Sequence, residues 1–90
     1  MIVAIPQYQD DIAPCFEAAN HFLISSLENG REVSSKIVGC PECDGLAQIR
    51  LMRDSNVAVL ICNGIKRIYR DMLQSAGIEV ISNITYSVRQ

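Results

Sequence analysis

Residues 57–81 read VAVLICNGIKRIYRDMLQSAGIEVI, and this stretch decides the fold. Its first six residues are all apolar, as is typical of a parallel strand buried on both faces. After the turn at Asn63-Gly64, apolar side chains recur at helical spacing over residues 65–76. Residues 78–81 then form a second short strand. The stretch therefore predicts a β-α-β unit in which two parallel strands are joined by a right-handed crossover.

The preceding residues extend this unit into a sheet. Residues 44–53 have the apolar spacing of a helix, and Asp44 is placed to cap its first turn. Residues 21–27 and 31–38 read as strands joined by the hairpin turn Asn29-Gly30. Residues 2–5 read as a further strand, followed by a long polar loop over residues 7–19 with a helical turn at its end. The predicted order is β-β-β-α-β-α-β: an α/β fold with a mixed five-stranded sheet and helices packed on it.

Length and composition restrict the classes of function. The chain has 90 residues, so we expect one domain spanning 1–90. Its net charge of −2 gives no electrostatic support for nucleic-acid binding. The longest apolar run is far shorter than the ~20 residues of a membrane-spanning helix. The start, MIVAIPQYQ, has neither the basic region nor the apolar region of a secretory signal, so we expect a cytoplasmic protein.

Four cysteines are the unusual feature of the composition: Cys15, Cys40, Cys43 and Cys62. In a reducing compartment, the C-x-x-C motif at residues 40–43 indicates a metal, cluster or redox site rather than a structural disulfide. If the strands at residues 2–5, 31–38 and 57–62 all run in one direction, their carboxyl ends share one edge of the sheet. The loops after the first two strands carry Cys15, Cys40 and Cys43, and the end of the third strand carries Cys62. Ligands of open α/β sheets bind at this edge.

His21, the only histidine, starts the strand of opposite direction and is expected at the same edge. Sulfur and imidazole donors suit copper, zinc, iron–sulfur or molybdenum–sulfur species better than magnesium or calcium. Each residue also has a plainer interpretation. His21 is typical of a half-buried residue at a strand end, and Cys62 of a small buried apolar side chain.

Three segments of the chain resemble the dinitrogenase iron–molybdenum cofactor biosynthesis family. They are the start MIVAIP, residues 12–24 (IAPCFEAANHFLI) and residues 57–80, with VAVLICNGI at one end and AGIEV at the other. The resemblance implies a ribonuclease H-like three-layer α/β fold without the nuclease carboxylates. It also implies nitrogenase cofactor carriers, and the orange protein with its molybdenum–copper sulfide cluster, as relatives.

The chain departs from the family pattern at two places. Where the family often has His-Phe-Gly, this sequence has Cys15-Phe16-Glu17, so a thiol stands in place of an imidazole. Where the family commonly has glycine after Asn-Gly-Ile, this sequence has Lys66. A basic residue and exposed N–H groups at a helix start attract anions, so Lys66 is a candidate contact for an anionic cluster. Its plainer interpretation is an ordinary surface lysine.

The first hypothesis is therefore a non-enzymatic protein that binds or carries a metal–sulfur cluster of the iron–molybdenum or molybdenum–copper type. Cys40, Cys43 and Cys15 are its expected metal ligands, with Cys62, His21 and Lys66 as further cofactor-binding candidates. Its expected partners are the cluster, an apo-metalloprotein acceptor or a cluster-assembly protein, with no nucleic acid and no membrane. A C-x-x-C dithiol redox protein and an interaction module that has lost the cluster site are the alternatives.

Overall fold

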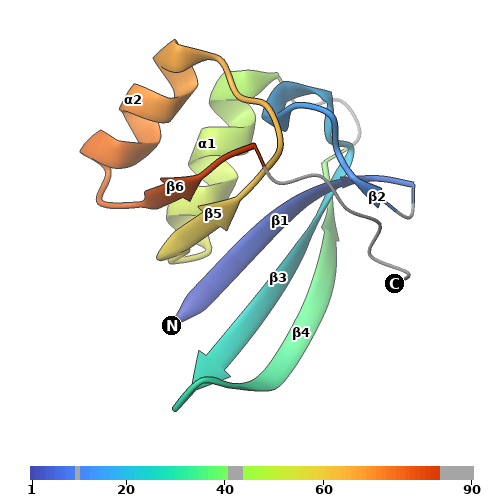
Figure 1. Cartoon of the computed structure of the whole chain (residues 1–90), viewed down its shortest axis with the longest axis vertical. Helices are drawn as coiled ribbons and strands as arrows, with labels where there is room; N and C mark the ends of the chain where they lie inside the picture. The colour runs from blue at the N-terminus through green and yellow to red at the C-terminus, as the bar shows by residue number, and fades with distance from the viewer. Residues whose placement is uncertain (10, 41–43, 84–90) are drawn as a thin grey trace.

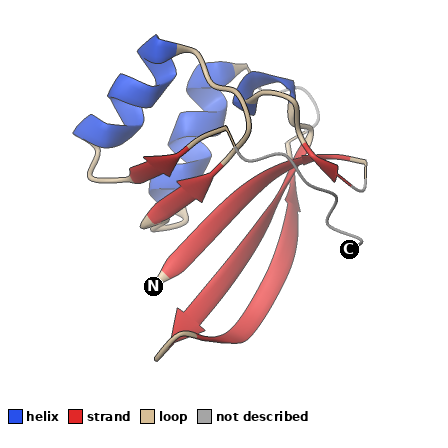
Figure 2. Cartoon of the chain, in the orientation of Figure 1, coloured by secondary structure: helices blue, strands red, loops and turns tan. Residues whose placement is uncertain are grey.

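The computed structural model describes residues 1–9, 11–40 and 44–83, and within them it contains a six-stranded mixed sheet and two α-helices (Figures 1 and 2). Five strands lie side by side in the order β4-β3-β1-β5-β6, and β2 pairs with β1. The elements are β1 (Ile2–Tyr8), β2 (Asp11–Ile12), the 3₁₀ turn η1 (Phe16–Ala18), β3 (His21–Glu28), β4 (Arg31–Gly39), α1 (Gly45–Asp54), β5 (Val59–Ile61), α2 (Arg67–Ser75) and β6 (Glu79–Ile81).

The strand directions confirm the predicted α/β class and mixed sheet. β1, β5 and β6 are parallel neighbours, whereas β3 is antiparallel to both β1 and β4. β1, β4, β5 and β6 therefore all point the same way. The turn between β3 and β4 has positive φ angles of 54° at Asn29 and 77° at Gly30, as the predicted Asn-Gly hairpin requires.

Both helices pack on one face of the sheet. Ile49 and Met52 from α1 and Leu73 from α2 enter a single core together with Ala4, Phe22, Ile24, Leu60 and Cys62 of the strands. Alternate strand residues point to opposite faces, so these strand residues share the helix-covered face. Among the described residues, no helix lies over the other face. The far end of the β3–β4 hairpin also projects beyond the helices (Figure 1).

The predicted loop over residues 7–19 is more ordered than expected. β1 continues through Pro6 to Tyr8, and β2 pairs back onto its end. The helical turn expected at the end of this loop is present as η1, shortly before β3. Pro6 is tolerated inside the strand even though it has no N–H group to donate to the sheet. The path of the chain toward the carboxyl edge is therefore fixed by backbone pairing.

The predicted helix faces are only partly buried. The apolar stripe over residues 65–76 buries Leu73 completely, but Ile68 is 61% and Met72 39% exposed. Leu46, in the apolar stripe predicted for the first helix, is 53% exposed. Spacing thus predicted the helices correctly, while the small sheet covers only part of each stripe. No helix within the described ranges is long and apolar enough to cross a membrane.

Candidate functional site

The carboxyl edge of the sheet carries the loops that hold the predicted site residues. Because β1, β4 and β5 are parallel in direction, the segments that follow them leave from one edge. Cys15 follows β1, Cys40 follows β4 and Cys62 follows β5. His21 begins β3, which runs the opposite way and therefore starts at this edge. Cys43, the remaining expected ligand, lies outside the described residues.

The segment around Cys15 is fastened to the residues after β5. Cys15 forms an isolated parallel bridge with Gly64. The Phe16 N–H donates to the Gly64 carbonyl at 2.7 Å, and the Gly64 N–H donates to the Pro14 carbonyl at 3.0 Å. A Cβ atom at position 64 would lie 2.8 Å from that Pro14 oxygen, so the close approach needs glycine. Cys15 is therefore held beside the end of β5.

Phe16 is the anchor of this segment. Its side chain is fully buried, and its ring centroid lies 5.8 Å from that of Phe22 and 6.4 Å from that of Tyr69. Both ring pairs are tilted, a geometry that aromatic side chains favour. Burial of Phe16 therefore fixes η1 onto the core and sets the position of the neighbouring thiol.

The two free thiols at this edge differ in character. Cys62 has an exposed fraction of 0%, and burial raises the pKa of its thiol to about 11, with Arg70 opposing the shift and Glu17 adding to it. Cys15 is half-buried, and burial together with the nearby Glu17 raises the pKa of its thiol. Both thiols are protonated at neutral pH, but only Cys15 is accessible to a metal that could displace the proton.

Cys40 and His21 are brought together by the end of the β3–β4 pair. His21 pairs with Gly39, and the Cys40 N–H donates to the Asn20 carbonyl at 2.9 Å. Nδ1 of His21 lies 2.6 Å from Oδ1 of Asn20, which leaves the other ring nitrogen for a second partner. Cys40 is buried, with an exposed fraction of 5%, and is disulfide-bonded. It can therefore act as a thiolate ligand only after reduction.

Lys66 is the N-cap of α2, and the anion-attracting end of this helix is in contact with the chain's own carboxylate. Oε1 of Glu17 accepts a hydrogen bond from the Lys66 N–H at 3.0 Å. A carboxylate at a helix N-terminus is stabilised by the helix dipole. An anionic cluster at this position would therefore compete with Glu17, which stands where the family often has glycine.

The sequence did not point to two polar side chains at this edge, the buried Gln48 and the half-buried Arg70. Gln48 is fully buried, and its Nε2 donates to the Ala19 carbonyl at 3.0 Å, while its Oε1 has no hydrogen-bond partner among the described residues. Arg70 donates from Nη2 to Oγ of Ser82 at 2.6 Å, and its buried Nε has no partner within the same residues. The only sign of the burial of Gln48 in the sequence was its position in the helix, next to Ile49 on the buried face.

The donor set fits a metal–sulfur group only in part. Within the part of the chain that the structure describes, no three side chains of His, Cys, Asp or Glu are grouped closely enough to hold a metal ion. Cys62 contributes to the core rather than to an open site. The described soft donors that remain are Cys15, His21 and, once reduced, Cys40, so a closed ligand shell also needs a donor from outside the described residues.

Comparison with known proteins gives one family for the whole chain. The family model described as dinitrogenase iron-molybdenum cofactor matches residues 1–90, which confirms the resemblance found in the sequence. No protein of curated function matches the chain significantly.

Among solved structures, a candidate dinitrogenase from Methanocaldococcus jannaschii is 26% identical, with a TM-score of 0.77, and the match covers 91% of this chain and 74% of that one. The apo form of the orange protein from Desulfovibrio gigas is 20% identical, with a TM-score of 0.78 over 99% of this chain and 81% of that one. A candidate NifB protein from Thermotoga is 22% identical, with a TM-score of 0.75 over 98% of this chain and 80% of that one. The latter two likenesses show a shared fold.

Proposed function

Because the chain belongs to the dinitrogenase iron–molybdenum cofactor family, we propose that it is a non-enzymatic protein that binds or carries a metal–sulfur cluster. The observation that supports this most directly is the gathering of Cys15, Cys40 and His21 on loops and strand ends at one edge of the sheet. Thiolate and imidazole are the donors that copper and iron–sulfur species prefer. The cluster is the cargo of the protein, of the iron–molybdenum or molybdenum–copper type.

The proposed ligands are Cys15, Cys40 and Cys43, with His21 as a neighbouring donor. Cys40 is disulfide-bonded, so a thiol reductant has to act first. Two reductant thiols give two electrons and two protons, the S–S bond breaks to two protein thiols, and the reductant leaves as its own disulfide. Those protein thiols then lose their protons as they bind metal, which makes binding weaker in acid.

We leave Cys62 and Lys66 outside the primary ligand shell. The Cys62 side chain is enclosed by the core, and burial raises the pKa of its thiol to about 11, so removing its proton is costly. The Lys66 N–H is already bonded to Glu17, and its exposed side chain is free to approach an anionic cluster only from outside. The partner of such a carrier is an apo-metalloprotein acceptor or a cluster-assembly protein.

The test is anaerobic reconstitution of the reduced protein, either with iron and sulfide or with molybdate, copper and sulfide. We expect visible charge-transfer absorption together with metal retained through gel filtration. The double variant Cys40→Ser/Cys43→Ser should lose both signals, Cys15→Ser should weaken them, and the matched control Cys62→Ala should keep them. A double variant that retains the wild-type spectrum contradicts the proposed ligands, and a wild-type chain that retains no metal contradicts the function.

A dithiol redox protein is the second candidate, and the disulfide at Cys40 favours it. A disulfide reductase assay on the metal-free protein separates the two functions. Turnover that requires Cys40 and Cys43, in a chain that retains no metal, supports the redox function. Metal retention without turnover supports the carrier.

A further inference from the structure

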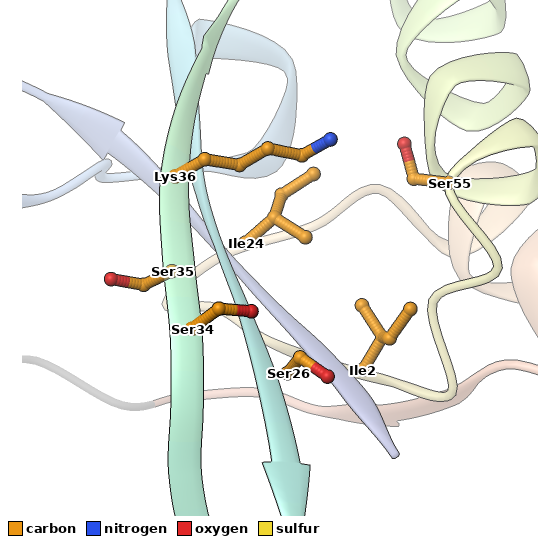
Figure 3. A pocket seen from close by; sticks show the side chains of 7 residues that line it. All are labelled: Ile2, Ile24, Ser26, Ser34, Ser35, Lys36 and Ser55. Carbon is orange, nitrogen blue, oxygen red and sulfur yellow. The ribbon is translucent and has the colours of Figure 1, made fainter.

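A cavity lies at the end of the sheet opposite to the cysteines. It has a volume of about 310 Å³ and is bounded by β1, β3, β4 and the residue that follows α1 (Figure 3). Sites for small ligands have volumes of about 300–1,000 Å³, so this cavity fits only a small molecule. It shares no residue with the proposed cluster site, so a ligand in this cavity is independent of cluster binding.

The register of the strands decides which side chains face the cavity. Ser34 of β4 pairs with Ser26 of β3, which pairs with Ile2 of β1. In the next row, Lys36 pairs with Ile24. Residues directly opposite one another point to the same face of a sheet, so these five side chains lie on the helix-covered face that also holds the core.

The polar residues of this face lie at its outer border, where Ser34 and Lys36 of the edge strand are exposed and Ser26 is half-buried. Ser26 and Ser34 are small, and together with Lys36 they leave a hollow beside the buried Ile24. Figure 3 shows Lys36 extending from β4 toward Ser55, which follows α1, while Ile24 and Ile2 lie in the apolar part of the cavity. The hollow thus has one cationic end and one apolar wall.

The cation is available for a ligand. Among the described residues, no carboxylate forms an ion pair with the Lys36 ammonium, and no hydrogen bond joins it to another group. Two carbonyls near the end of α1 already accept from backbone donors, Leu51 from the Ser55 N–H at 3.0 Å and Met52 from the Val57 N–H at 3.1 Å. Among the described residues, Lys36 makes no hydrogen bond to the helix C-terminus that it faces.

We propose that this cavity binds a small monocarboxylate that carries a short apolar chain. The carboxylate accepts hydrogen bonds from the Lys36 ammonium and from the Ser55 hydroxyl toward which it points (Figure 3), since charge-assisted bonds of this kind are the stronger ones. The apolar chain covers Ile2 and Ile24. A carboxylate ligand without an apolar chain leaves the apolar wall exposed to water. An apolar ligand without a carboxylate leaves the Lys36 ammonium unpaired.

The test is a titration of the metal-free chain with hexanoate, in which binding is monitored by the amide chemical shifts in NMR spectra. We expect saturable shifts at residues 24–26, 34–36 and 55. Lys36→Met should weaken binding at least tenfold, and Lys36→Arg should restore most of it. Lys66→Met, which removes an exposed lysine at the other edge of the sheet, should leave the affinity within twofold of wild type.

Two further probes separate the contributions of charge and chain. Hexanamide, which has the same chain without the charge, and inorganic phosphate, which has charge without the chain, should each bind at least tenfold more weakly than hexanoate. Equal binding of either probe overturns the proposal, as do wild-type affinity in Lys36→Met or shifts that map to other residues. Because no cluster is present, the result does not depend on the proposed carrier function.

Discussion

Cys15 and Cys62 lie on two segments that are joined by hydrogen bonds between Gly64 and the residues on either side of Cys15, yet the two thiols differ in accessibility. Cys62 shares the helix-covered face with Leu60, two residues earlier, and is enclosed by the core. Cys15 lies in a connection outside the regular alternation of a strand and stays half-buried. The comparison teaches that topology brings a residue to an edge of a sheet, whereas the direction of its side chain decides whether it can react there.

Removing the Phe16 ring, which anchors the Cys15 segment, should have the largest effect on this difference between the two thiols. Phe16→Ala should lower the free energy of unfolding by about 3–5 kcal/mol, because a fully buried aromatic ring is lost and a cavity is left. We also expect alkylation of Cys62 to become faster, since the ring that helps to enclose the core is absent. Denaturant unfolding and mass spectrometry of alkylated protein measure the two effects.

Phe16→Leu is the matched control, because leucine fills most of the same space and should cost much less. If Phe16→Ala unfolds at the wild-type denaturant concentration, η1 is not fixed by this ring, and the account of how Cys15 is positioned is wrong.

Alkaline pH sharpens the contrast by titrating the buried thiol. The pKa of Cys62 is raised to about 11 in the folded protein, above its ordinary value, so the folded state holds the proton more tightly than the unfolded state. The stability that this provides is fully present below the ordinary thiol pKa and is lost as the pH rises toward about 11. Cys62→Ala should therefore lose less stability than wild type over this interval.

Urea unfolding at several pH values between neutral and strongly alkaline measures this difference. Lysine and tyrosine groups titrate in both proteins, so their contribution cancels in the comparison. Cys15→Ala is the control and should keep most of the wild-type pH dependence, because Cys15 is more accessible. Parallel curves for wild type and Cys62→Ala would show that this thiol is not buried as described.

The smallest expected effect concerns Glu17, which contacts both regions. Glu17→Gln should cost about 0.3–1 kcal/mol, because the charge at the N-terminus of α2 is lost while a hydrogen-bond acceptor for the Lys66 N–H remains. The same change should speed alkylation of Cys15 at a fixed pH, since the Glu17 charge contributes to its raised pKa. Glu28→Gln, at the far end of β3, is the matched control and should change neither quantity.

Much of the fold followed from local patterns. Continuous apolar runs, helical spacing and the Asn29-Gly30 turn predicted the strands, helices and directions that place the cysteine loops at one edge. Element ends were less predictable. Strand propensity stopped the first strand before Pro6, whereas pairing with β3 carries β1 on to Tyr8.

The candidate site was less accessible to sequence reasoning, because its decisive contacts join distant residues. Glu17 and the Lys66 N–H are 49 positions apart, and no pattern in the sequence links them. The burial of Cys62 depends on which strand face the helices cover. The apolar stripes of the helices overstated how much of each helix is buried. Periodicity gives the direction of a stripe but not how much of it a small sheet can cover, as the exposed Ile68 shows.

The irregular register in the β3–β4 pair has a consequence for behaviour at high concentration. β4 is an edge strand of nine residues, and the pairing shifts between Ser26 and Leu27, which interrupts the regular ladder. A flat, regular edge would be a template on which other chains could polymerise. Ser26 pairs with Ser34 and Leu27 with Glu32, so the exposed Val33 is the extra residue of a bulge that increases the local twist and interrupts this edge at its hairpin end, whereas the edge around the exposed Ile37 stays regular.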